Sequence, residues 1–408
     1  MGNMRGILLA LILHCFIQLS AQDTITVMSY NVLNYPISNA SKADTLKPII
    51  QYVKPDIFMI TELTSSSGAT TILNDALNVG STSSYQKATY FNGPDTDNML
   101  FYNSDKLILY SQHEIATSLR NISEYVLYYD ALNITAQSDT VFIHCYMAHL
   151  KASTGSSNEQ QRNQEAVTLK NYLDSKSNIE NVILGGDFNV YTSAEAAYNT
   201  ILNGGNVKLL DPINTPGTWN NNSSFASVHT QSTRSGTIGD GGSFGGMDDR
   251  FDFIFFNNDL PNGTNGLTYV PNSYNALGND GNHFNKSINA SPTNTSAPSN
   301  IIDALYYMSD HLPIVIKAYV AANVGVEESQ APSKWQGYFA NNQFYFNSNK
   351  TEKRLTVEVF DILGKLVKSE NYSSESKLQI GLHDLHASMY FVKVTSSNQK
   401  RSFKVLIK

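Results

Sequence analysis

The sequence has few residues that could cross-link the chain. It contains only two cysteines, Cys15 and Cys145. Cys15 lies in an N-terminal segment that we expect to be removed, so Cys145 is left alone and no intramolecular disulfide can form. Cys145 lies in an apolar, strand-like run, which predicts a buried and unreactive thiol. We therefore expect the fold to be held by its hydrophobic core and by any bound metal.

Long apolar runs are also missing, since a helix that spans a bilayer needs about 20 apolar residues. The N-terminal run Ile7–Phe16 is shorter, follows Arg5, and is followed by small residues up to Ala21 and Gln22. This order is typical of a secretory signal. We therefore predict a signal peptide at residues 1–22 and a mature chain that is not inserted in a membrane.

Charged residues make up only 15% of the chain, and they are unevenly spread. Residues 23–320 carry 15 Lys and Arg against 27 Asp and Glu, a net charge of −12, whereas residues 321–408 carry a net charge of +4. With this negative charge, residues 23–320 are expected to repel polyanions at long range. This argues against a tight, processive nucleic-acid binder, but it does not exclude a nuclease.

Hydrophobic patterning predicts strands mixed with helices in residues 23–320, which implies a layered α/β sandwich. Helices are expected at Asp44–Val53 and Asn158–Lys176. Two polar stretches, Asp211–Gly246 and Leu260–Asn300, are expected to be loops, the first a long excursion over the surface. The expected strands are Thr24–Ser29, Asp56–Thr61, Asn98–Tyr102, Tyr125–Ile134, Thr140–His149, Asn181–Gly185, Arg250–Phe256 and Ile314–Val320.

The C-terminal part has a different pattern. Residues 321–342 have the composition of a linker, and residues 343–408 contain short strands at close spacing, which predicts a small all-β sandwich domain. The expected strands are Leu355–Phe360, Leu366–Ser369, Leu378–Ile380, Met389–Thr395 and Arg401–Ile407.

Six polar clusters follow or lie in predicted strands of the first domain, so they can meet at one rim of a sandwich although they are far apart in sequence. Each alone has a simple structural explanation, such as a turn or a solvated carboxylate. The clusters are Ser29-Tyr30-Asn31, Thr61-Glu62, His149, Gly186-Asp187-Phe188-Asn189, Asp252, and Ser309-Asp310-His311.

In this order the clusters resemble the endonuclease/exonuclease/phosphatase superfamily. The combination of GDFN at Gly186–Asn189 with a late SDHLP at Ser309–Pro313 carries the resemblance, supported by SYNVLNY at Ser29–Tyr35 and RFDFIFF at Arg250–Phe256. The resemblance covers roughly three quarters of the chain. It implies a four-layer α/β sandwich with two central sheets, and hydrolysis of phosphoric esters with a divalent metal.

The resemblance also implies roles for the clustered residues. Glu62 would bind the metal, with Asn31 and Asp310 completing its ligands. These are hard oxygen donors, which suit Mg²⁺, Mn²⁺ or Ca²⁺ better than zinc. Asp187 would orient or deprotonate the attacking water, and Asn189 would hold the phosphate or the metal.

Two histidines are implied to contact the scissile phosphate. His311 would pair with Asp252, which fixes its tautomer and favours its charged form. His149 matches the second histidine, although a structural histidine at a strand end is the alternative. In the polar loop after Asp211, Arg234 could bind phosphate, or it could be a solvated arginine.

The tail resembles the C-terminal sorting domain of the type IX secretion system. The residues that match are VEVFDILGKLV at Val357–Val367, SMYFVKV at Ser388–Val394 and the final KVLIK. We therefore expect a monomeric enzyme that is exported by the type IX machinery and is secreted or held at the cell surface. A basic β module that binds nucleic acid is the alternative for this part of the chain.

Three functional hypotheses remain at this point. The first is a secreted metal-dependent phosphodiesterase that degrades extracellular nucleic acid. The second is a hydrolase of phospholipids, as in sphingomyelinases, or of sugar phosphates, in the same superfamily. The third is a catalytically silent binding module, but such a module would not need Asp187, Asp252 and His311 together.

Overall fold

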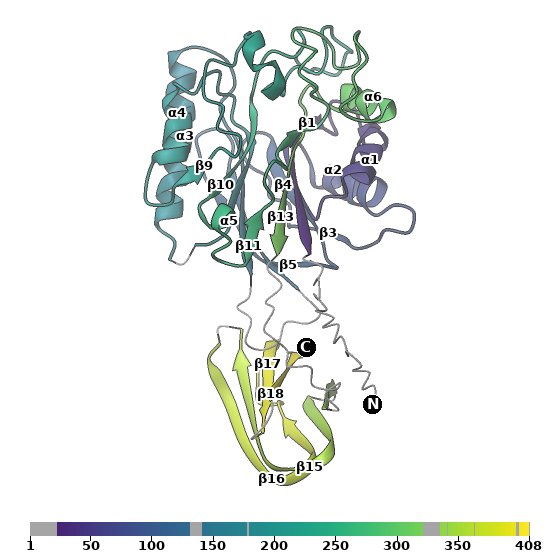
Figure 1. Cartoon of the computed structure of the whole chain (residues 1–408), viewed down its shortest axis with the longest axis vertical. Coiled ribbons are helices and arrows are strands. Elements are labelled where there is room, and N and C mark those ends of the chain that lie inside the picture. Colours follow the sequence, from purple (N-terminus) through teal and green to yellow (C-terminus); the bar gives the residue numbers. More distant parts are fainter. Residues whose placement is uncertain are drawn as a thin grey trace, which may run out of the picture.

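A computed structural model gives the architecture of the chain (Figure 1). The predicted signal peptide, with Cys15, lies outside the described residues, as do residues 321–334 of the predicted linker. Among the described residues, no helix combines the length and hydrophobicity that a membrane span requires. The structure describes residues 23–130, 141–177, 179–320, 335–340, 342–362, 364–396 and 400–407.

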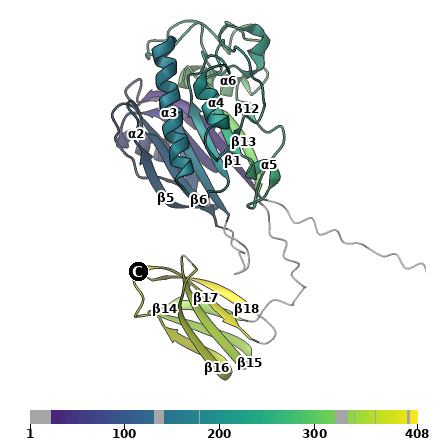
Figure 2. The same ribbon diagram turned by 90° about the vertical axis from the view of Figure 1, so that its left-hand side faces the viewer.

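The first domain has two central β-sheets, and its helices lie on the two outer sides (Figures 1 and 2). This arrangement confirms the predicted four-layer sandwich. The first sheet has the order β11-β13-β1-β2-β4-β3, with β12 also paired to β13. The second sheet has the order β5-β6-β7-β8-β10-β9.

The strands of the first sheet are β1 (Thr24–Tyr35), β2 (Ile57–Leu63), β3 (Tyr85–Lys87), β4 (Asp97–Asn103), β11 (Leu267–Tyr269), β12 (Asn275–Ala276) and β13 (Ile314–Val320). The strands of the second sheet are β5 (Leu107–Ile115), β6 (Ile122–Tyr129), β7 (Phe142–His149), β8 (Val182–Asp187), β9 (Leu209–Leu210) and β10 (Asp252–Asn257). The helices are α1 (Lys42–Val53), α2 (Ser66–Thr71), the π-helix η1 (Ile72–Leu77), α3 (Ser156–Asp174), α4 (Ala196–Asn203), the 3₁₀ helix η2 (Ser223–Val228), α5 (Asp259–Asn262) and α6 (Ser299–Met308).

Alternating side chains of the central strands supply two cores. In β7, Cys145 and Met147 belong to the core that includes the first sheet, whereas Tyr146 and Ala148 face the core under α3 and α4. This is the period of two that a strand buried on both faces requires. Cys145 is fully buried and is a free cysteine, and burial raises the pKa of its thiol, as predicted for an unreactive residue.

The helix predicted at Asp44–Val53 is α1, and it ends where predicted. Lys54 takes a left-handed conformation with φ of 51°, and its N–H bonds to the Ile50 carbonyl. Pro55 follows, and a residue before proline is disfavoured in the helical region, so the helix cannot continue. The sequence does not predict the short elements α4, α6 and β5, because segments of this length show little periodicity.

The loop between Asp211 and Gly246 contains one 3₁₀ helix and otherwise no regular helix, as predicted, but it is not a surface excursion throughout. His229, Thr230, Thr233 and Arg234 are buried. Each of them has at least one polar side-chain atom with a partner in the protein: Thr233 Oγ1, for example, donates to the Ser309 carbonyl at 2.6 Å. His229 Nδ1 and Arg234 Nε and Nη2 have no hydrogen-bond partner. Because hydrogen bonds satisfy most of the polar groups, a polar sequence can pass through the interior.

The C-terminal domain is all-β, as predicted, and its strands form one continuous sheet that bends around its own core. The prediction that the linker extends to residue 342 is wrong. Gln336–Ala340 forms a strand paired with the next, and Trp335 is buried in this core, because an amphipathic segment of five residues has too little pattern to be separated from a linker. The strands are β14 (Gln336–Ala340), β15 (Gln343–Asp361), β16 (Leu366–Gly381), β17 (Ser388–Thr395) and β18 (Lys400–Ile407).

Gly186 allows β8 to lie close to β7. Its φ is +149°, and a Cβ placed on it would lie 1.8 Å from the carbonyl oxygen of Ala148. We expect Gly186→Ala to lower the free energy of unfolding by about 3 kcal/mol, the upper range for overpacking a rigid site. Thermal or denaturant unfolding measures this change. Gly236→Ala is the control, since a Cβ added at Gly236 would meet no atom within 4 Å; equal stability of the two variants would contradict the expectation.

Candidate functional site

The strand directions bring the predicted site residues to one edge of both sheets. In the first sheet, β1 and β2 are parallel and β13 is antiparallel to β1. In the second sheet, β7 and β8 are parallel and β10 is antiparallel to β8. In this register His149 and Asp252 both pair with Asp187. The carboxyl ends of four strands and the amino ends of two therefore meet at the same rim.

A cavity of about 270 Å³ opens at this rim. Six predicted residues line it, and Asn31 and Asp252 hydrogen-bond to three of these six. Arg120, Tyr191 and Gln231 also line the cavity, and the sequence does not predict them. The six predicted lining residues are Glu62, His149, Asp187, Asn189, Asp310 and His311.

Asn31 links the carboxylates of Glu62 and Asp187. Its Nδ2 lies 2.8 Å from Glu62 Oε1 and 3.1 Å from Asp187 Oδ2, and its Oδ1 accepts the backbone N–H of Leu33. The other Glu62 oxygen accepts the N–H of Asn34 at 2.9 Å. One amide thus orients two carboxylates that come from different sheets.

The backbone at the site is strained at positions where the sequence does not predict strain. Glu62 has a φ of 61° and Asn189 a φ of 51°. Asparagine tolerates the left-handed region, but for glutamate it is uncommon and costs free energy. The bond from Asn34 to Glu62 and the shift of register between β1 and β2 accompany this conformation. With this strained backbone, Glu62 lines the cavity.

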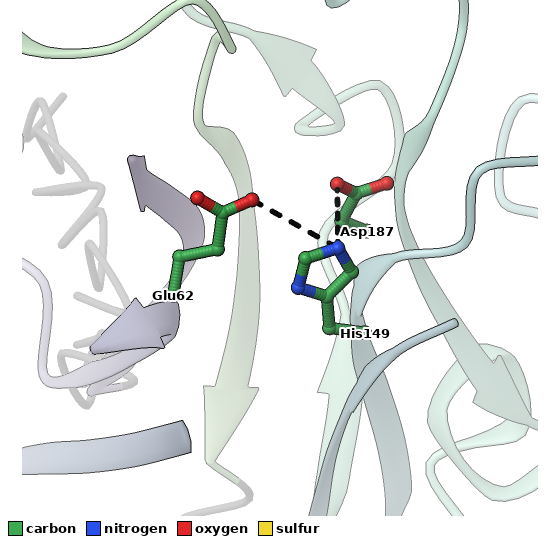
Figure 3. Close-up of side chains that lie close together, drawn as sticks. All are labelled: Glu62, His149 and Asp187. Carbon is green, nitrogen blue, oxygen red and sulfur yellow. Dashed lines mark ion pairs between the residues drawn. The ribbon is translucent and has the colours of Figure 1, made fainter. Parts of the chain in front are cut away.

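His149 lies between the two carboxylates (Figure 3). Its Nε2 is 3.5 Å from Asp187 Oδ2 and 3.9 Å from Glu62 Oε1. Burial, together with the positive charges of Arg120 and His311, lowers the pKa of His149 well below its usual value. His149 is therefore neutral at pH 7.

The pKa of His311 is shifted in the opposite direction to that of His149. Its Nδ1 lies 2.7 Å from Asp252 Oδ2, and its Nε2 lies 3.6 Å from Asp187 Oδ2. Burial alone would lower the pKa of His311, but the negative charges of Asp252, Asp187 and Asp310 raise it well above its usual value. His311 is held as an imidazolium with one N–H directed into the cavity.

The pKa values of two acidic groups at the site are raised, as is typical of carboxylates that bind a cation. Burial and the nearby charges of Asp252 and Glu62 raise the pKa of Asp187 to about 7, although His311 lowers it. Burial and the charge of Asp310 also raise the pKa of Glu62. Close, buried carboxylates of this kind repel one another, and a cation would relieve that repulsion.

A divalent metal fits the residues that are present. The buried Oδ1 of Asp310 has no hydrogen-bond partner, whereas Oδ2 accepts two bonds, so one carboxylate oxygen is free for a ligand. Glu62, His149 and Asp187 place one potential ligand atom each within 4.8 Å of one another, and so do Asp187, Asp252 and His311. Asp310 belongs to neither of these two groups. Glu62 is the one predicted ligand within them.

Arg234 lies outside the cavity lining, and it is fully buried instead of solvated. Its Nη1 lies 2.9 and 2.8 Å from the two oxygens of Asp240, which also bonds to Lys42 Nζ at 2.7 Å. Arg120 is the arginine that lines the cavity. It lies in a short loop before β6, where no spacing or neighbouring motif distinguishes it in the sequence.

Residues 28–311 match the sequence model of the endonuclease/exonuclease/phosphatase family. The chain belongs to this family. The match confirms the predicted resemblance and identifies the chain as a phosphoric-ester hydrolase of a divalent-metal-dependent family. Residues 340–408 match the model of a secretion system C-terminal sorting domain, which confirms the second resemblance.

Solved structures of the endonuclease/exonuclease/phosphatase fold are similar to this chain at low identity. D. rerio TDP2 complexed with a single-strand DNA product is 15% identical, with a TM-score of 0.48, and the match covers 73% of this chain and 100% of that one. The human Nocturnin catalytic domain is 17% identical, with a TM-score of 0.43 and coverage of 73% and 97%. ANGEL2, a 2′,3′-cyclic phosphatase, is 13% identical, with a TM-score of 0.41 and coverage of 73% and 96%. No curated protein matches the chain.

Proposed function

We propose that this member of the family is a secreted, divalent-metal-dependent phosphodiesterase that cleaves nucleic acid. The observation that carries the proposal is the pairing of Asp187 with a charged His311, itself held by Asp252, beside the acidic groups Glu62 and Asp310. Phosphodiester hydrolysis requires an aligned water, donors to the phosphate and neutralisation of its charge. The site has groups for all three.

Each side chain has a defined task in this proposal. Asp187 holds the attacking water and accepts its proton. His311 donates its free N–H to a non-bridging phosphate oxygen, while Asp252 keeps the proton on the other ring nitrogen. Asn189 and neutral His149 add neutral contacts to the same phosphate.

The metal would be held by Glu62 and Asp310, with Asn31 orienting the carboxylate of Glu62. A bound cation neutralises charge on the phosphate and on the attacking oxygen. Because the potential ligands are mostly oxygen atoms, Mg²⁺, Mn²⁺ and Ca²⁺ are the candidates. In this proposal Arg120 takes the phosphate-binding role that the sequence assigns to Arg234.

The wall of the cavity favours a nucleotide substrate. Tyr191 packs edge-on against Phe251 with ring centroids 4.9 Å apart, and both line the cavity beside Asn189. An aromatic surface next to a phosphate site suits a base or a sugar, since stacking on aromatic rings is tolerant of sequence. With a net charge of −12 on residues 23–320, we expect few phosphate contacts and a weak dependence of affinity on salt.

Metal removal tests the proposal directly. We expect the purified protein to cleave single-stranded DNA or RNA oligonucleotides with Mg²⁺, Mn²⁺ or Ca²⁺, and to lose this activity in EDTA. Added metal should restore it. Full activity in EDTA would exclude the metal role, whereas cleavage only of phospholipid vesicles or sugar phosphates would assign the chain to another substrate class of the family.

Export is tested by deleting the sorting domain. The fold places the cut before Trp335, because residues from there onward form one sheet and one core. In a host with a type IX system, we expect the shortened protein to retain its hydrolytic activity but to stay inside the cell envelope. Normal secretion of the shortened protein would contradict the proposal, and loss of its activity would show that the two domains depend on each other.

A further inference from the structure

Gln231 lies between two groups on which the proposed chemistry depends. Its Nε2 is 3.0 Å from Asp310 Oδ2 and 2.6 Å from His311 Nε2, and the residue lines the cavity. The sequence gives no hint of this position, since Gln231 belongs to the polar loop that is expected at the surface.

The backbone of Gln231 is fixed, so its side chain is the part that can respond to a ligand. The N–H of Gln231 donates to the Asp249 carbonyl at 3.1 Å. Its carbonyl accepts the N–H groups of Asp248 and Asp249, both at 2.9 Å. Isolated bridges pair Gln231 with Asp249 and with His311. The loop therefore holds this residue as firmly as a strand would.

The carboxamide determines how Asp310 is turned. Gln231 Nε2 and the backbone N–H of Ser243, which lies 2.8 Å away, both donate to Oδ2 of Asp310. The other oxygen, Oδ1, is buried and has no partner. Two donors on one oxygen fix the rotation of the carboxylate and leave the second oxygen available for a ligand.

The same carboxamide also meets the nitrogen of His311 that faces the cavity. Nδ1 of His311 donates a hydrogen bond to Asp252, because a carboxylate can only accept one. Nε2 is therefore the ring nitrogen that remains available to a substrate. Gln231 Nε2 lies 2.6 Å from that atom. Because both nitrogens are donors when His311 is an imidazolium, they do not bond to each other, and one acceptor oxygen can take a hydrogen bond from both. A phosphate oxygen that reaches His311 must therefore also come within reach of the carboxamide.

We propose that Gln231 is a substrate-contacting residue: its carboxamide holds Asp310 in place in the free protein and donates to the phosphate oxygen that His311 binds. The proposal rests on the phosphoesterase function proposed above. A neutral donor suits this position, because a positive group would compete with the cation and a negative group would repel the phosphate.

Two substitutions separate the contact with phosphate from support of the metal site. Gln231→Ala removes the donor, and Gln231→Glu keeps the shape but replaces the donor with a charged acceptor. We expect Gln231→Ala to lower kcat/KM roughly 10- to 100-fold, the scale of one hydrogen bond to a charged group. Gln231→Glu should be worse than Gln231→Ala, although its added carboxylate should let it bind Mn²⁺ at least as tightly as the wild type.

Calorimetry gives the readout that a merely structural role would not change. Inorganic phosphate is titrated into the Mn²⁺-loaded wild type and variants, and Mn²⁺ into the metal-free proteins. We expect phosphate affinity to fall about tenfold or more in Gln231→Ala and further in Gln231→Glu. Gln164→Ala, in an exposed position on α3, is the control and should match the wild type in both titrations.

Wild-type phosphate affinity in both Gln231 variants would overturn the inference, and so would a wild type that binds no phosphate. Failure of the proposed function gives a different result: a wild type that cleaves no phosphodiester while phosphate still binds in a Gln231-dependent way. Because Gln231→Glu is nearly isosteric, it provides a folded variant even if Gln231→Ala disturbs the loop.

Discussion

We expect Asp187→Asn to lower kcat for phosphodiester hydrolysis by at least ~100-fold, the usual scale for a lost general base. The substitution keeps the shape of the side chain and can keep its contact with Asn31, but it removes the charge that accepts a proton from the attacking water. Substrate affinity should change much less, because the variant retains the residues proposed to contact the phosphate, Arg120, Asn189 and His149. Steady-state kinetics with an oligonucleotide substrate, together with a circular dichroism spectrum, measures the effect.

Asp303→Asn is the matched control for this variant. Asp303 is exposed on α6 and does not line the cavity, and its Oδ1 accepts a 3.4 Å bond from Asn289. The control should therefore retain wild-type kcat. If folded Asp187→Asn keeps more than about a tenth of the wild-type kcat, a difference of only ~1.4 kcal/mol, then Asp187 is not the base.

We expect the second large effect from His311→Ala, again a loss of at least ~100-fold in kcat, because the proposed charged donor to the phosphate is removed. This variant should also be less stable, since Asp252 is left buried without its ion-pair partner. The double variant with Asp187→Asn should be little slower than the slower single variant, because residues that serve one step are not additive.

The stability effect has its own control. Asp252→Asn together with His311→Ala removes the unpaired charge, so its thermal unfolding midpoint should lie above that of His311→Ala alone. Independent, multiplicative losses of kcat in the variants of Asp187 and His311 would contradict the idea that the two residues serve the same step.

Much of the fold and most of the site could be predicted from the sequence. Polar residues at the ends of apolar runs, such as His149 and Asp187, mark strand ends, and strand ends of one sandwich share a rim. The motifs fix which strands take part. The layers follow from the mixture of strands and helices, since each apolar face must be covered by another layer.

The rest depends on contacts that are remote in sequence. Arg234 is buried because it pairs with Asp240, which also binds Lys42, and no local pattern indicates that pairing. Arg120 and Gln231 reach the cavity from loops whose course is determined by packing. The strained backbone of Glu62 likewise follows from the tertiary fold, which overrides local preference.

The hydrogen bond from Asn31 to Asp187 crosses from one sheet to the other, so the candidate catalytic centre lies at the interface between the two sheets. The two sheets approach each other closely beside this centre: a Cβ on Gly185 would lie 2.9 Å from Met59 and 3.0 Å from Ser29. The centre therefore exists only while the sheets are closed, as in enzymes whose active sites form between subunits. A cation or substrate that binds across this interface binds only to the closed arrangement of the sheets. Binding therefore stabilises that arrangement by mass action. For the secreted enzyme proposed above, which would meet extracellular proteases that attack opened chains, supply of the cation would then set the lifetime of the enzyme as well as its rate.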